Sequence, residues 1–138
     1  MLTKIMVATD GSAQADKALK TAVELAKAEA AFLTIVSVIP TPIVGSTETI
    51  GLYRAEVTKM YNAFLRKAEA FAVNNGINVK ALTLNGHPGQ VIVDYLNKYP
   101  QDLVIVGHKG VSNMQALVMG SVAYTVANQA PCAVLIIK

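Results

Sequence analysis

Three glycines and a serine near the end of the chain have a spacing that suits the binding of phosphate. They are Gly107, Gly110, Gly120 and Ser121, with Gly107 directly after an apolar run and Ser121 at the head of an expected helix. Where a strand ends, glycine can take positive φ angles that let the backbone approach an anion and aim successive N–H groups at it. A serine hydroxyl and the positive end of a helix dipole favour an anion at the same point. Lys109, between the first two glycines, can add a positive charge.

Each glycine also has an ordinary structural interpretation. Gly107 and Gly110 could shape a turn, and Gly120 could let a helix pack closely against the sheet. Glycine makes up about 7% of an average protein, so three glycines and a Ser or Thr at these offsets arise by chance in roughly one chain of this length in two or three hundred. The combination, rather than any single glycine, therefore favours a phosphate site.

Other common catalytic patterns are missing from the sequence. Neither G-x4-G-K-[ST] nor G-x-G-x-x-G occurs, which argues against a motor-type NTPase and a dinucleotide dehydrogenase. The only histidines, His87 and His108, have no metal-ligand or triad spacing with Cys, Asp or Glu, and we expect both in surface loops. No residue is an obvious base for activating water. We therefore predict no catalytic residue and no metal held by side chains.

Composition limits the class of protein. A chain of 138 residues that is 53% hydrophobic suits a single domain over 1–138. The net charge of +3 comes from scattered Lys and Arg, which argues against nucleic-acid binding. Cys132 is the only cysteine and is expected to be a small core residue, as suits a reducing cytoplasm. No apolar stretch reaches the roughly 18 to 20 residues of a membrane span, and the start lacks a signal-peptide profile, so we expect a cytoplasmic protein without membrane contact.

Apolar runs and helical patterns alternate along the chain. Strands are expected at 5–8, 32–39, 79–84, 103–106 and 133–137, and most of these runs lack the alternation of half-exposed strands. Helices are expected at about 15–26, 57–72, 91–96 and 118–128, the first capped by Ser12. Strands that alternate with helices predict a doubly wound α/β fold, with five buried parallel strands and helices on both faces of the sheet.

The stretch 40–51 fits neither pattern. It contains two prolines, two glycines and three threonines, and we expect a loop after the second strand. Because open α/β sheets bind ligands beyond the carboxyl ends of their strands, this loop could act as a lid. A tolerated surface insertion is the alternative.

The phosphate-site spacing resembles that of the universal stress proteins. Nucleotide-binding members of this family carry G-x2-G-x9-G-[ST], which Gly107, Gly110, Gly120 and Ser121 match in full. Further matches are VATDGS at 7–12, GHP at 86–88 and PCAVL at 131–135, so the resemblance covers the whole chain. It implies a Rossmann-like three-layer domain with strand order 3-2-1-4-5 that binds ATP between the first and fourth strands.

The resemblance also implies roles for single residues. Asp10 would lie by the nucleotide and accept hydrogen bonds from the ribose, since a carboxylate accepts from hydroxyl groups and repels phosphates. Its position alone also allows a helix cap, as the less favoured alternative. Ala8, Val38 and Val106 would surround adenine and ribose, and Lys109 is a better candidate than His108 for contact with phosphate. The full expected set is Ala8, Thr9, Asp10, Val38, Val106, Gly107, Lys109, Gly110, Gly120, Ser121 and Val122.

The family resemblance further implies a homodimer. The last strand, 133–137, would be a sheet edge in the implied order, yet it is apolar on both faces. Pairing with its own copy about a two-fold axis would remove that edge. A covering loop or helix is the alternative.

The leading hypothesis from the sequence is an ATP-binding regulatory protein of the stress response, whose nucleotide-bound state changes its surface or its contacts with an unidentified protein partner. AMP and ADP are alternative ligands, and Mg²⁺ could accompany a triphosphate, held by phosphates and water. A slow ATPase or an autophosphorylating enzyme is a second hypothesis. An interaction module that does not bind ATP is a third.

Overall fold

The computed structural model describes residues 1–41, 46–109 and 119–138, in which strands and helices alternate throughout. The strands are β1 (Lys4–Ala8), β2 (Phe32–Ile39), β3 (Val79–Asn85), β4 (Leu103–Gly107) and β5 (Ala133–Ile137). The helices are α1 (Ala13–Glu29), α2 (Thr47–Asn74), α3 (Pro88–Lys98) and α4 (Ser121–Gln129). All neighbouring strands pair in parallel, in the order β3-β2-β1-β4-β5, which confirms the predicted fold class and strand order.

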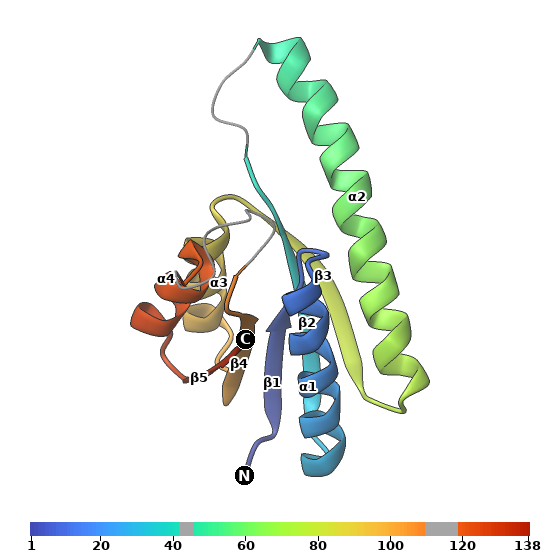
Figure 1. Cartoon of the computed structure of the whole chain (residues 1–138), viewed down its shortest axis with the longest axis vertical. Helices are drawn as coiled ribbons and strands as arrows, with labels where there is room; N and C mark the ends of the chain where they lie inside the picture. The colour runs from blue at the N-terminus through green and yellow to red at the C-terminus, as the bar shows by residue number, and fades with distance from the viewer. Residues whose placement is uncertain (42–45, 110–118) are drawn as a thin grey trace.

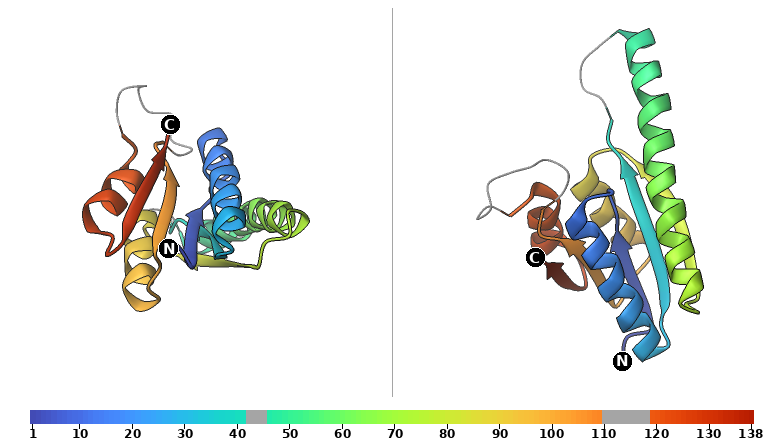
Figure 2. Two further views of the ribbon diagram at one scale, coloured as in Figure 1. Left: turned by 90° about the horizontal axis from the view of Figure 1, so that it is seen from below. Right: turned by 45° about the vertical axis from the view of Figure 1, so that its right-hand side comes forward.

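The sheet lies between two layers of helices (Figures 1 and 2). Alternate residues of a strand face opposite sides, so Ile5 and Val7 of β1 pack with α1 and α2, while Met6 packs with α3 and α4. Each face therefore has its own hydrophobic cluster. The two clusters fix the central strands from both sides and hold their carboxyl ends at one edge of the sheet.

The edge strands are less buried than we expected. The interior residues of β1, β2 and β4 are buried, but β3 and β5 are only half-buried along most of their length. The prediction of five buried strands is therefore wrong for β3 and β5. An apolar run in a terminal strand can look the same in sequence as one in a central strand, although only the central strand has neighbours on both sides.

Helix α2 begins ten residues earlier than predicted. The hydroxyl of Ser46 accepts a hydrogen bond from the Thr49 amide at 3.1 Å and caps the helix, and Glu48 lies in its first turn. The loop predicted over 40–51 is therefore wrong from Thr47 onward, and 42–45 lie outside the described residues. In Figure 1 the first turns of α2 extend beyond the strand ends. Among the described residues, no helix is both long enough and apolar enough to cross a lipid bilayer.

Candidate functional site

A cleft of about 230 Å³ opens at the carboxyl ends of β1 and β4. Of the eleven residues predicted to bind nucleotide, Gly110 lies outside the described residues. The other ten all line this one cleft: Ala8, Thr9, Asp10, Val38, Val106, Gly107, Lys109, Gly120, Ser121 and Val122. Parallel strands bring these residues together because their carboxyl ends meet at the same edge of the sheet.

The end of β1 is held firmly by backbone and side-chain hydrogen bonds. The Thr9 amide donates to the carbonyl of Val36 at 2.9 Å, and the Thr9 carbonyl accepts from the buried hydroxyl of Ser37 at 3.0 Å. Asp10 Oδ1 accepts from the Ser12 amide at 2.9 Å, which fixes the carboxylate beside the turn into α1. The Asp10 side chain is thereby set at the cleft as a hydrogen-bond acceptor.

The N-cap of α1 is Ser12, as predicted. Its hydroxyl accepts from the Ala15 amide at 3.1 Å. The cap role that the position of Asp10 also allowed therefore belongs to Ser12.

One wall of the cleft is apolar. Val38 and Val106, at the ends of β2 and β4, are 6% and 2% exposed, and Ala8 lies between them on β1. Ile92 of α3 and Ala123 of α4 complete this wall. Such a surface can bury a flat aromatic ring, but its side chains can make no hydrogen bonds.

Gly107 is required for space rather than for a positive φ angle. A Cβ atom on Gly107 would lie 3.2 Å from the backbone and Cβ of Gln14 and from the carbonyl oxygen of Lys109. Neither Gly107 nor Gly120 has a positive φ; Gly120 has φ −63° and ψ 155°. The left-handed angles that glycine permits are therefore not used at Gly107 or Gly120. Gly107 instead lets β4 pass close to the start of α1.

Hydrogen bonds hold His108, Lys109 and Gly120 in place beside the cleft. The His108 amide donates to the carbonyl of Ile137 at 2.7 Å, and the Gly120 amide donates to the carbonyl of His108 at 2.8 Å. The Lys109 amide donates to Gln14 Oε1 at 2.6 Å. These bonds join the start of α4 to β4, β5 and α1, which are parts of the rigid core.

The start of α4 points its polar backbone at the cleft. Gly120 is the N-cap residue and makes no side-chain cap hydrogen bond, and α4 starts at Ser121 rather than at the predicted residue 118, which lies outside the described residues. The first amides of a helix have no acceptor within it, and the helix dipole makes this end positive. Because Ser121 and Val122 line the cleft, this end can bind an anion there.

The cleft also contains residues that we did not predict. They are Ser12, Ala15, Tyr61, Pro88, Ile92, His108 and Ala123. Tyr61 is the one from α2, and burial, then the charge of Asp10, then Tyr53 raise the pKa of its phenol. In the sequence Tyr61 is one of several apolar residues at helical spacing, so only the packing of α2 distinguishes it from a core residue.

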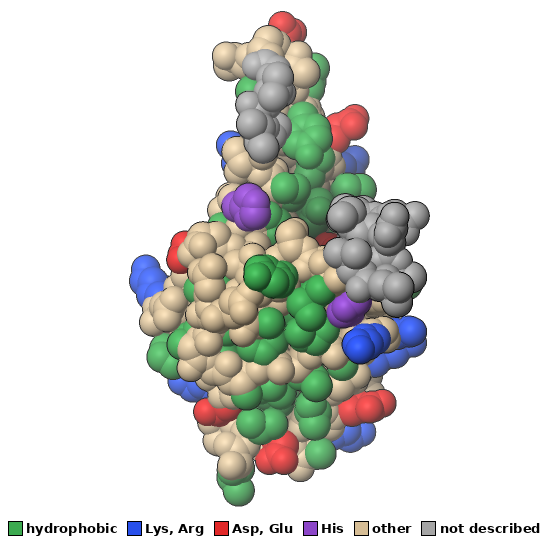
Figure 3. All heavy atoms as spheres, turned by 60° about the vertical axis from the view of Figure 1, so that its left-hand side comes forward, with side chains coloured by type: hydrophobic (Ala, Val, Ile, Leu, Met, Phe, Trp, Pro, Cys, Tyr) green, Lys and Arg blue, Asp and Glu red, His purple; other side chains and the backbone are tan. Residues whose placement is uncertain are grey.

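The two histidines differ in their surroundings. Both side chains are visible at the surface (Figure 3), and His87 is exposed just before α3, as expected for a loop residue. His108 is half-buried and lines the cleft, so a plain surface role does not describe it. Within residues 1–41, 46–109 and 119–138, no group of three or more His, Cys, Asp and Glu side chains could hold a metal ion.

Comparison with known proteins agrees with the geometry. The model of the universal stress protein family matches residues 1–138. Universal stress protein YxiE of Bacillus subtilis is 31% identical over 148 residues, which cover 100% of each chain. The solved structure of universal stress protein UspA from Lactobacillus plantarum has a TM-score of 0.92 at 25% identity and covers 99% of this chain and 98% of its own.

A further solved structure was determined with a ligand. It is a universal stress protein in complex with cAMP, with a TM-score of 0.77, 27% identity, and coverage of 99% of this chain and 97% of its own. The family match over the whole length, the relative of equal extent and the shared fold lead to one conclusion. This chain belongs to the universal stress protein family.

Proposed function

We propose that this protein binds an adenine nucleotide, with ATP as the leading candidate, in the cleft at the ends of β1 and β4. The observation that carries the proposal is that one cleft brings together three kinds of surface. They are an apolar wall, a carboxylate and a helix N-terminus. These three surfaces are complementary to a base, a sugar and a phosphate chain.

Each part of the nucleotide has a specific counterpart in the proposal. Val38 and Val106 contact the base, because burying a flat ring there removes apolar surface from water. Asp10 accepts hydrogen bonds from the ribose hydroxyl groups. The amides of Ser121 and Val122 donate to phosphate, and the ammonium group of Lys109 adds charge at that end. The cAMP bound by the structural relative supports adenosine as the recognised group.

The proposal favours a regulatory role. A bound phosphate would contact both Lys109 and the start of α4, and so would join these two parts of the cleft. A protein partner that recognises this face would then bind the occupied and empty states with different affinity. Magnesium would be held mainly by phosphate and water. We expect this role in the cytoplasm.

We also propose that the protein is a homodimer paired through β5. Strand β5 pairs with β4 on one side only, and its residues are apolar and, apart from exposed Ala133, half-buried. The Ile137 carbonyl points towards β4, so the N–H groups of Val134 and Ile136 point to the outer edge. Val134→Pro removes one outward donor but none that faces β4. Sedimentation equilibrium should find a dimer for the wild type and a folded monomer for Val134→Pro; a wild-type monomer would contradict the dimer.

The first test of the function is calorimetric titration of nucleotide-free protein with ATP and magnesium, repeated with AMP and GTP. We expect saturable binding of about one ATP per chain and weaker binding of GTP. Gly120→Val fits the backbone angles of −63° and 155°, which any residue adopts, but its branched side chain enters the phosphate position. Loss of one charge-assisted hydrogen bond corresponds to about 1.5 to 3 kcal/mol, or about 10- to 100-fold in Kd.

Gly51→Ala is the matched control for the glycine substitution. Gly51 lies in α2, and a Cβ atom there would meet nothing within 4 Å. Its ATP affinity should equal that of the wild type. Unchanged affinity in Gly120→Val would refute the phosphate placement, and absence of saturable binding by the wild type would refute the function. Product that forms in proportion to wild-type enzyme, and not with Gly120→Val, would instead indicate slow hydrolysis.

A further inference from the structure

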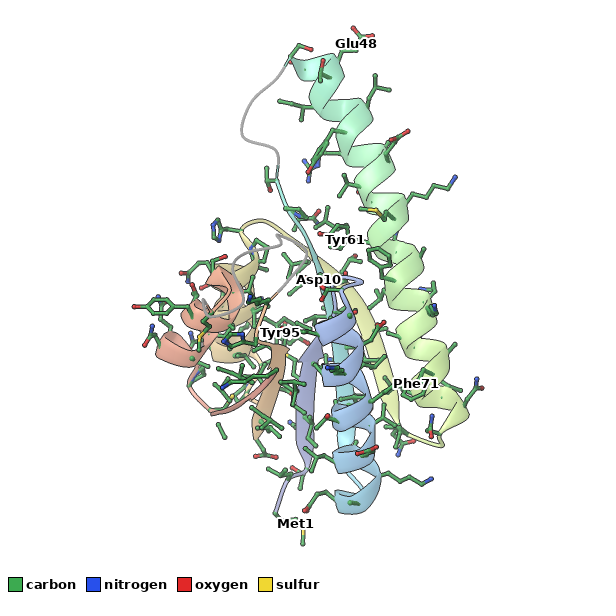
Figure 4. The ribbon with its side chains drawn as sticks, in the orientation of Figure 1. Met1, Asp10, Glu48, Tyr61, Phe71 and Tyr95 are labelled. Carbon is green, nitrogen blue, oxygen red and sulfur yellow. The ribbon has the colours of Figure 1, made fainter. Side chains whose placement is uncertain are left out.

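Tyr61 is the residue through which α2 reaches the cleft. It lines the same cleft as Asp10 and Val38, although it belongs to a helix that otherwise covers the outer face of β2 and β3. In Figure 4 Tyr61 lies between α2 and the tip of β1, near Asp10. The phenol is thus on the carboxylate side of the cleft, where the proposed function places the sugar.

The position of Tyr61 is fixed by tight packing one turn further along α2. The rings of Tyr61 and Phe64 are in edge contact, with centroids 5.8 Å apart and planes at 67°. The Phe64 ring in turn lies directly against Gly11, where a Cβ atom would be only 2.5 Å from it. Gly11 follows Asp10 in the chain, so this contact sets the register of α2 against the end of β1. Tyr61 and Asp10 are therefore held in a defined relation.

The surroundings of Tyr61 keep its phenol protonated. Burial and the nearby Asp10 carboxylate both raise the pKa above its ordinary value of 10.0, because each disfavours the phenolate anion. At neutral pH Tyr61 is therefore an O–H donor as well as an acceptor. This property complements Asp10, whose ionised carboxylate can only accept.

A sugar hydroxyl group needs both kinds of partner when it is buried. When the sugar hydroxyl group donates a hydrogen bond to Asp10, its oxygen still has lone pairs that need a hydrogen-bond donor. Asp10 Oδ1 already accepts a hydrogen bond from the Ser12 amide, which fixes the orientation in which the carboxylate would accept one from the sugar. In the cleft, Tyr61 supplies a neutral O–H donor beside that carboxylate.

We propose that Tyr61 is a specificity-determining residue that donates a hydrogen bond to a ribose hydroxyl group of the nucleotide, which at the same time donates to Asp10. This inference rests on the proposed function, because it needs a nucleotide with its sugar at this end of the cleft. It goes beyond that function because it gives α2 a direct part in recognising ribose. Nucleotide binding is then sensed by the helix whose first turns extend past the sheet (Figure 1).

The test compares Tyr61→Phe with the wild type against three ligands: ATP, 2′-deoxy-ATP and 3′-deoxy-ATP. The substitution removes only the hydroxyl group and keeps the ring contact with Phe64. Loss of one neutral hydrogen bond should weaken ATP binding about 3- to 10-fold. The deoxynucleotide that lacks the contacted hydroxyl group should lose less than about 2-fold, because the interaction is already missing. Tyr53→Phe is the matched control, since Tyr53 lies on the same helix, outside the cleft.

The outcomes separate the inference from the proposed function. A wild type that binds no nucleotide refutes both. A wild type that binds ATP, with equal affinity in Tyr61→Phe, refutes the inference alone. Equal weakening of binding for ATP and both deoxynucleotides also refutes the inference. The Tyr61 hydroxyl group would then act through packing or through Asp10 rather than by a hydrogen bond to the sugar. Selective weakening for ATP, with no change in Tyr53→Phe, supports it.

Discussion

Replacing Gly11 with alanine should destabilise the protein at the junction of β1, α1 and α2. Gly11 has φ +82°, an angle that residues with a side chain adopt only at a cost. The new Cβ atom would also lie 2.5 Å from Cε2 and Cζ of Phe64 and 2.8 Å from its Cδ2. The Phe64 ring is in edge contact with Tyr61, so it cannot move away without disturbing a second ring.

Two costs and one smaller gain determine the expected loss of stability. The left-handed backbone angle costs about 1 to 2 kcal/mol, and overpacking against an aromatic ring costs about 1 to 3 kcal/mol. Alanine also restricts the unfolded chain, which returns about 0.4 to 1 kcal/mol. Gly11→Ala should therefore lower the free energy of unfolding by about 1 to 4.5 kcal/mol, a large part of the about 5 to 15 kcal/mol that is usual for a domain.

Urea unfolding followed by circular dichroism measures this loss. Gly51→Ala is the control, and it should gain about 0.5 to 1 kcal/mol because Gly51 lies in an exposed helix with open space around it. Phe64→Leu should relieve part of the Gly11→Ala penalty, so the double variant should be more stable than additivity predicts. A Gly11→Ala variant within about 0.5 kcal/mol of the wild type, or an additive double variant, would refute this account of the junction.

Two further predictions follow from shifted pKa values. Hydrogen bonds from the Thr3 and Lys4 amides and the Thr3 hydroxyl lower the pKa of Asp102 below its ordinary value of 3.8. The ionised Asp102 carboxylate therefore stabilises the fold above pH 3.8, and this stabilisation is lost as the pH falls through the lowered pKa. Urea titrations should therefore show Asp102→Asn less stable than the wild type at neutral pH, with the difference vanishing in acid. The carboxylate of Asp10 helps to raise the pKa of Tyr61, so Asp10→Asn should shift the Tyr61 absorbance titration, isolated by subtracting Tyr61→Phe, towards 10.0 without reaching it, because burial remains.

Most of the fold could be predicted from local patterns. The five apolar runs coincide with the strands, and the family resemblance supplied their order. The start of α2 could not be predicted in this way, because residues 47–56 are exposed apart from half-buried Ile50 and so have no buried face to create a period. The cap formed by Ser46 and the acidic Glu48 were the available signals, and the neighbouring prolines and glycines concealed them.

The sequence predicts the position of site residues at strand ends better than that of site residues on helices. The topology of a parallel sheet gathers every carboxyl end at one edge, so Asp10 and Gly107 meet once the strand order is known. A helical period, in contrast, predicts which face of α2 is buried, but it does not predict the position of the helix along its own axis relative to the sheet. That position depends on the contact between Gly11 and Phe64, which are far apart in the chain. A shift of α2 by one turn, about 5.4 Å, would place a different residue at the cleft, so the assignment of Tyr61 needed the packed structure.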